Sequence, residues 1–283
     1  MATRPPDLPD YERPPVDEVV LGVQYLPIPG FSQAHAGLYW RTVQSAYPKI
    51  EDHPRIDAAI ERLSGPAPAA PAIPGLPLGL QIQFGGAPNS IRSWLISDDE
   101  TWVLQIQNDC FLHNWRKKEG EYPHFDRVQE RFTKSLAGFA DFLRAEGLPA
   151  PQIQQFEVSY INWVPQDVPI HQFFRPASAT KLSRSQLTRH PEQQAWIGSY
   201  IVSDSDRVPI ARLSIQVVGA IRADPVSGAK QGTQFTLTFR APMADATAKL
   251  SVAEIQQIGR KAIVQSFTDL TSGKSQTQWG RIQ

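Results

Sequence analysis

The pattern of apolar and polar positions starts with an unpatterned stretch and then predicts a strand. Residues 1–16 contain five prolines and no apolar period, so they are expected to form an extended arm. From Glu18 to Tyr25, apolar residues alternate with other residues, as a half-buried strand requires. The alternating positions are Val19, Leu21, Val23 and Tyr25.

Helical spacing follows in Ser32–Tyr47 and Pro54–Leu63, where Ser32 is a suitable N-cap and Pro54 falls in a first turn. Residues 65–78 are rich in proline and alanine and predict a loop. Short strand-like runs separated by turn residues then predict an antiparallel meander. These runs are Leu80–Phe84, Ile91–Ile96, Trp102–Gln107 and Cys110–Trp115. Phe125–Glu146, which carries an apolar stripe and is followed by Gly147, predicts a long helix.

The second half repeats this order of elements. It begins with a strand at Phe156–Val164 and a polar crossover over residues 171–194, whose helical potential starts near Ala179. Ser251 and Glu254 form a capping box at the start of the final helix, which runs to Leu270. The strands between crossover and helix are Ala195–Val202, Ile210–Val218 and Thr233–Arg240.

The chain is therefore predicted to have an α+β fold made of two related units, each ordered strand, helix, antiparallel meander, helix. The units cover residues 17–150 and 151–272, after the arm and before a tail at 273–283. Helices packed on one face of an antiparallel sheet bury both apolar surfaces. The order resembles TATA-binding-protein-like and helix-grip architectures.

Composition places the chain among ordinary globular proteins, with 41% hydrophobic and 20% charged residues among 283. No apolar run is long enough to span a bilayer and the N-terminus lacks an apolar signal core, so a cytoplasmic location is expected. The single cysteine, Cys110, excludes an intrachain disulfide and fits a reducing compartment.

The formal net charge of zero removes the general attraction that dominates nucleic-acid affinity. The balance differs between the halves. Residues 1–150 hold 14 basic and 19 acidic side chains, whereas residues 151–283 hold 14 and 9. Attraction between a half at −5 and a half at +5 would help the two units dock.

The stretch Asn108–Asp126 concentrates the most reactive residue types. Strand alternation sends Cys110 and His113 to opposite faces, which argues against a thiolate and imidazole pair. Cys110 is expected to be a buried apolar residue, and His113 a satisfied, half-buried side chain. The cations at Arg116–Lys118 fit a solvated turn, or an anion site if the arginine faces a pocket.

No other pattern indicates catalysis or a cofactor. The six histidines show no metal-ligand spacing, and the acidic groups at Asp98–Glu100 and Asp204–Asp206 fall in turns. The sequence contains no nucleophile elbow, phosphate loop or dinucleotide fingerprint. We therefore predict no catalytic residue, no metal and no cofactor.

Aromatic and amide residues near strand ends are the remaining candidates. Aromatic residues on or beside the predicted sheet fit core packing or a stacking surface. They are Tyr25, Trp40, Trp94, Trp102, Trp115, Tyr160 and Trp163. Asn114 and Asn162 are unusual inside strands, so each is expected to meet a specific hydrogen-bonding need. The predicted binding face carries Asn114, Trp115, Arg116, Tyr122, Tyr160 and Asn162.

Several phrases resemble a sporadically distributed prokaryotic family of about this length with no assigned activity. They include PPVDEVVLGVQY, GLYWRTVQSAYPKIED, VLQIQNDCFLHNWRK with EYPHFD, VSYINWV, KAIVQSFTDLTS and WGRI. The most specific pieces are Asn114-Trp115-Arg116 with Tyr122-Pro123, and Tyr160-Ile161-Asn162. The resemblance implies an accessory or defence-linked gene. It departs at Gly259-Arg260-Lys261, where a histidine is expected, so that position is predicted to carry no chemistry.

These observations leave three hypotheses of function. The first is a non-catalytic binding or assembly protein that recognises a protein partner or small ligand. The second is a nucleic-acid-binding protein that uses tandem sheets, which the neutral charge disfavours. The third is an enzyme of unknown class, in which a residue such as His113 meets a distant acid in the fold.

Overall fold

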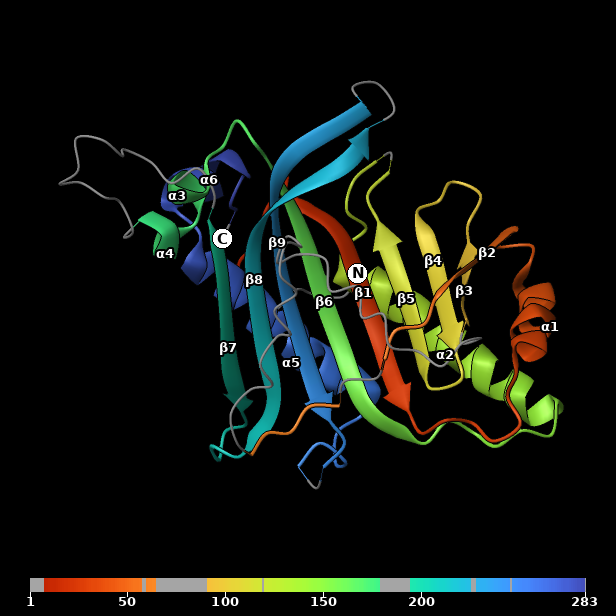
Figure 1. The fold of residues 1–283 in the computed structure, drawn as a ribbon. Helices are drawn as coiled ribbons and strands as arrows, with labels where there is room; N and C mark the ends of the chain where they lie inside the picture. The colour runs from red at the N-terminus through yellow and green to blue at the C-terminus, as the bar shows by residue number, and fades with distance from the viewer. Residues whose placement is uncertain are drawn as a thin grey trace.

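A computed structural model describes residues 8–57, 60–64, 91–118, 120–178, 194–224, 228–244 and 246–282. Within these ranges the strands form one antiparallel sheet in the order β2-β3-β4-β5-β1-β6-β9-β8-β7 (Figure 1). The strands are β1 (Val16–Tyr25), β2 (Lys49–Pro54), β3 (Ile91–Ile96), β4 (Trp102–Gln107), β5 (Cys110–Arg116), β6 (Ile153–Pro165), β7 (Ala195–Ser203), β8 (Pro209–Asp224) and β9 (Gly228–Pro242).

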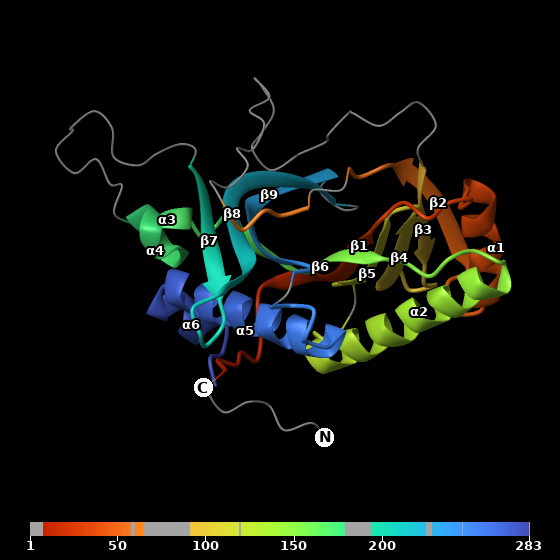
Figure 2. The same cartoon turned by 90° about the horizontal axis from the view of Figure 1, so that it is seen from below.

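The two long helices cover one face of the sheet, one under each half, and meet near its middle (Figure 2). We call this the helix-side face and the other the open face. The helices are α1 (Gln33–Val43), α2 (Phe125–Ala145), α3 (Ile170–Phe173), α4 (Arg175–Ser178), α5 (Val252–Leu270) and α6 (Gly273–Gln278). The prediction of an α+β fold with a large antiparallel sheet is confirmed.

Burial on the helix-side face explains why these elements form. Leu21 and Val23 of β1 and Phe132 and Phe139 of α2 are fully buried in one apolar cluster, which continues into the second half through Phe235. The alternating apolar residues of β1 and the apolar stripe of α2 thus pack in one core. In α5, Gly259 allows close packing, because a Cβ there would lie 2.7 Å from Phe239.

The described part of the arm contains no helix and docks against the tail through a bridge between Tyr11 and Arg281. The backbone N–H groups of Glu12 and Arg13 donate to the carbonyls of Gly280 and Trp279, both at 3.0 Å. Tyr11 lies edge-on to Phe267, and its hydroxyl is 2.8 Å from that of Thr268. The arm therefore packs against both the tail and α5 on the helix-side face.

The predicted helix at Pro54–Leu63 is wrong. Lys49–Pro54 is the edge strand β2, and the described residues that follow, 55–57 and 60–64, are not helical. They lie across the open face instead, where Arg55 pairs with Asp109 and the Glu61 carboxylate is 2.9 Å from Arg212. Long-range ion pairs outweigh local helix propensity here.

The predicted loop at 65–78 and the predicted strand at Leu80–Phe84 fall on residues outside the described ranges. The crossover begins with the short helices α3 and α4, and its expected helix from Ala179 also lies outside. No helix among the described residues is both long and apolar enough to cross a membrane.

Candidate functional site

The structure divides the six predicted site residues between the two faces of the sheet. Trp115, Tyr160 and Tyr122 belong to the helix-side core, and Asn162 lies on that side of β6. Asn114 and Arg116 alternate with Trp115 and so lie on the open face. The expectation of a single shared face is corrected, because consecutive residues of a strand cannot point to one side.

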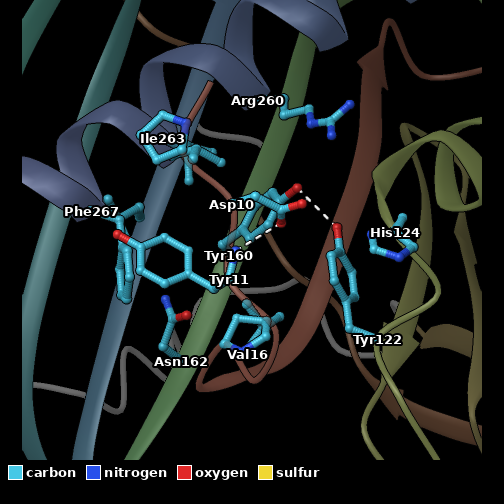
Figure 3. Close-up of a pocket in the computed structure, with 14 residues that line it drawn as sticks. Asp10, Tyr11, Val16, Tyr122, His124, Tyr160, Asn162, Arg260, Ile263 and Phe267 are labelled. Atoms are coloured by element: carbon cyan, nitrogen blue, oxygen red, sulfur yellow. Dashed lines mark hydrogen bonds between the residues drawn. The ribbon is translucent and has the colours of Figure 1, made fainter. Parts of the chain in front are cut away.

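The helix-side residues surround a cavity of about 60 Å³ between the arm, the central strands and α5 (Figure 3). Tyr122, Tyr160 and Asn162 line it, and Trp115 packs on Tyr122 with ring centroids 5.2 Å apart. The sequence motifs thus converge in space from β5, β6 and the turn before α2.

Polar groups around this cavity bind one another. The hydroxyls of Tyr122 and Tyr160 are 3.1 Å apart, and the Asn162 amide donates to the Phe235 carbonyl at 2.9 Å. Arg260 donates to Asp126 at 2.9 Å. Since these polar groups bind one another, the cavity is best explained as a structural junction between α2 and α5.

Arg260 was missed by sequence reasoning, which assigned its segment no chemistry. It is buried in α5, spans to α2 through Asp126, and lies over the Phe125 ring with its Cζ 5.1 Å from the centroid. A signal was present, because Arg260 follows Gln256 and precedes Ile263 at helical spacing on the buried stripe.

His124 has an unusual backbone at the rim of this cavity. It is the N-cap residue of α2, with φ 62° and ψ 153°, a region normally adopted by glycine. The strained residue brings its ring to the cavity, 6.0 Å from that of Tyr122. The turn thus ends at His124, and α2 begins at the next residue, Phe125.

A second group of residues surrounds Trp94 on the open face of β2 to β5. The His53 ring stacks on Trp94 with centroids 4.0 Å apart. The guanidinium carbons of Arg92 and Arg116 lie 5.3 and 5.5 Å from the centroid of the Trp94 ring. Gln105 is the direct cross-strand neighbour of Trp94. We call the group formed by His53, Arg92, Trp94, Gln105, Asn114 and Arg116 the Trp94 cluster.

Several buried polar atoms in the Trp94 cluster have no hydrogen-bond partner among the residues that the structure describes. The donors are Nε of Arg92, Nε1 of Trp94 and Nε of Arg116, and the acceptors are Oε1 of Gln105 and Oδ1 of Asn114. Gln105 is only 5% exposed and Asn114 only 4%. An unsatisfied buried polar atom costs roughly 1–3 kcal/mol, so this density of them distinguishes the cluster from the satisfied cavity.

The arginines of the Trp94 cluster form no salt bridge within the described residues, although Arg116 is the cross-strand neighbour of Glu18 on β1. Burial lowers the pKa of the Arg92 guanidinium, and no carboxylate within the described residues pairs with Arg92 or Arg116. Arg116 has only a long hydrogen bond, 3.3 Å, to the Glu100 carbonyl. By contrast, Arg212 and Arg240 on the same face each contact a carboxylate.

Asn114 connects the cluster to an acid on the neighbouring strand. Its Nδ2 donates to Glu18 at 2.5 Å, which fulfils the hydrogen-bonding need predicted for this asparagine. Burial raises the pKa of the Glu18 carboxyl, and the Asn114 hydrogen bond and Arg116 charge oppose that rise. The amide is therefore held with its oxygen unpartnered.

Cys110 and His113 point to opposite faces, as predicted. Cys110 is buried on the open face, and burial raises the pKa of its thiol. His113 is fully buried on the helix side with its Nε2 3.0 Å from the Tyr47 hydroxyl, but its Nδ1 is unpartnered. Burial lowers the His113 pKa to about 3, so neither side chain is ionised near neutral pH.

The other predicted aromatic residues divide in the same way. Tyr25, Trp40 and Trp102 join the helix-side core, whereas Trp163 lies on the open face beneath Arg222, whose Cζ is 4.5 Å from the ring centroid. Unlike the arginines near Trp94, Arg222 pairs with a carboxylate, that of Asp17 at 2.9 Å.

Neither a search for metal-binding groups nor a comparison with known proteins assigns a function to these residues. Within the ranges that the structure describes, no three residues among histidine, cysteine, aspartate and glutamate are grouped so as to hold a metal ion. In comparisons with known proteins, no family model matches the chain and no curated protein matches it.

Proposed function

We propose that the chain is a non-catalytic binding protein that holds a small anionic ligand on the open face of its sheet, at the Trp94 cluster. The observation that supports this most directly is the pair of half-buried arginines, Arg92 and Arg116, that flank Trp94 and form no salt bridge with a carboxylate of the described residues. Burying a charge without a partner is costly unless another group neutralises it. A bound anion would do so.

The unpartnered atoms define the chemistry of that ligand. Nε of Arg92, Nε of Arg116 and Nε1 of Trp94 are donors, and they suit a phosphate or carboxylate group. The oxygens of Gln105 and Asn114 are acceptors, and they suit hydroxyl or amine groups beside the anion. The ligand class is therefore an oxyanion that also carries hydrogen-bond donors.

The strand order supports the further proposal of two related units. The first strand of each half, β1 or β6, pairs with the last strand of its own meander, β5 or β9, and the two first strands pair with each other. This is the arrangement expected of the TATA-binding-protein-like or helix-grip repeat that the sequence pattern predicts. In this arrangement both long helices lie on the same face of the sheet.

Nucleic acid remains the alternative ligand, because its phosphates would meet the same two arginines. The negative balance of the first half, 14 basic against 19 acidic side chains over residues 1–150, opposes a polyanion. A cytoplasmic role in an accessory or defence-linked system also stays part of the proposal.

Isothermal titration calorimetry of the full chain tests the proposal with inorganic phosphate, glycerol 3-phosphate and malate. At least one oxyanion is expected to bind saturably. Glycerol 3-phosphate is expected to bind more tightly than phosphate, since its hydroxyls would donate to Gln105 and Asn114. A preference for phosphate or malate separates phosphate ligands from carboxylate ligands. The proposal fails if none of the three gives saturable heat at millimolar concentration.

Arg92→Ala is expected to weaken the tightest of these interactions about 10- to 100-fold, because a hydrogen bond to a charged group contributes about 1.5–3 kcal/mol. Calorimetry on the variant measures the change. Arg127→Ala is the matched control, since it removes an equal charge from an exposed position on α2. Equal affinities for the two variants would place the ligand elsewhere.

A further inference from the structure

The two edges of the sheet differ in how they resist pairing with another strand. Edge strand β2 has the sequence KIEDHP, with three charged residues and a terminal proline. The opposite edge, β7, has the sequence AWIGSYIVS, with no charged residue and no proline. Charges and proline on an edge strand prevent association with other strands. Only β2 carries this protection.

The unprotected edge is also apolar and accessible. Ile197 is 46% exposed, Tyr200 47% and Ile201 43%. Within the described chain, β7 has a single strand partner, β8, so its outer backbone groups bond to no other strand. A nine-residue uncharged strand with an open edge is suited to extending a sheet.

The order of residues in β7 is self-complementary about its central residue, Ser199. An antiparallel pair of β7 strands related by a two-fold axis at Ser199 places Ile197 opposite Ile201 of the second copy. The same register places Gly198 opposite Tyr200 and Trp196 opposite Val202. Apolar residues would then meet on the open face, and on the helix side Tyr200 of each copy would lie opposite Gly198, over which the Trp196 ring of the same strand already lies.

We infer that β7 pairs antiparallel with β7 of a second copy of this chain, joining two sheets into one continuous sheet. The second copy is the favoured partner because the register matches β7 to itself, and because no like charges meet across the axis. The inference concerns assembly and does not depend on ligand binding at β3 to β5.

Sedimentation equilibrium of the full chain over a micromolar concentration range tests the inference. The wild type is expected to approach twice the chain mass of 31.6 kDa. Ser199→Lys is expected to weaken the dimer at least tenfold, because two lysines would face each other at the axis. Ser199→Asp is expected to do the same. An equimolar mixture of the two variants should recover the dimer through opposite charges.

Ser45→Lys is the control, as it adds a charge at an exposed position far along the chain from β7. It is expected to leave the dimer unchanged. A wild type that stays monomeric overturns the inference, and so does a dimer that Ser199→Lys does not weaken. Failure of the mixture to recover the dimer would exclude the two-fold register at Ser199. Phosphate titration of Ser199→Lys keeps this test separate from the proposed function, since its binding is expected to be unchanged.

Discussion

Replacing Glu61 with alanine is expected to lower the free energy of unfolding by about 3–5 kcal/mol, because it leaves a buried arginine without its charge partner. The Glu61 and Arg212 side chains are only 6% and 5% exposed, and their ion pair is 2.9 Å long. Arg212 also donates to the Arg62 carbonyl at 2.7 Å. Urea unfolding of the two proteins measures the difference.

Asp17→Ala is the matched control, because Asp17 forms an ion pair of the same length with another arginine of β8 at an exposed position. Its expected cost is below about 1 kcal/mol. Replacing both partners, Glu61→Ala with Arg212→Leu, is expected to be less damaging than Glu61→Ala alone. Equal small losses for Glu61→Ala and Asp17→Ala would show that residues 60–64 do not rest on the open face.

His113 is expected to make the folded state sensitive to acid. Burial lowers its pKa from 6.5 to about 3, so between these values the unfolded chain binds a proton that the folded chain does not. Stability contributed by neutral His113 is therefore complete above pH 6.5 and is lost as pH falls, by about 1.4 kcal/mol per pH unit. The total reaches about 5 kcal/mol near pH 3.

His113→Phe removes this titration while keeping an aromatic ring on the helix-side face. Chemical unfolding of the wild type and the variant at several values between pH 7 and pH 4 gives the difference in their free energies. That difference is expected to change with pH in favour of the variant, because titration of carboxylates common to both proteins cancels. A difference that stays constant with pH would mean that His113 has the same pKa in the folded and the unfolded chain.

The sequence pattern predicted most of the elements whose two sides differ in burial. β1, α2 and α5 have buried and exposed sides, so their apolar periods are regular and their positions were predicted closely. The ends of β8 and β9 were missed, since residues 219–224 and 228–232 form a hairpin that carries few buried side chains. Without a buried side, a strand leaves no alternation to detect.

Segments whose conformation depends on distant residues could not be predicted. The sequence over residues 55–64 has a helical pattern locally, but Arg55 bonds to Asp109 in the turn before β5 and Glu61 bonds to Arg212 of β8, and both partners lie far along the chain. Arg260 was overlooked for a similar reason, because its partner Asp126 belongs to another helix. Local periodicity holds no information on such pairs.

The predicted site residues were chosen by type, and the fold decided which of them meet. The motif Asn114-Trp115-Arg116 is split by strand alternation, so Trp115 joins Tyr122 on one face while its neighbours join Trp94 on the other. Asn162 has its expected hydrogen bond in the core. Trp94, the centre of the open-face cluster, was noticed as an aromatic residue but could not be linked to Arg92 and Arg116 without the sheet order.

Two-dimensional ¹H–¹⁵N NMR of the tryptophan indole groups, recorded while oxyanion is added, tests the account most directly. The Trp94 indole signal, assigned through Trp94→Phe, is expected to move saturably, because its unpartnered Nε1–H would donate to the ligand. The signals of Trp102 and Trp115, on the helix-side face, are expected to stay in place. Movement of the Trp115 signal with a fixed Trp94 signal would assign the ligand to the helix-side cavity and contradict the account.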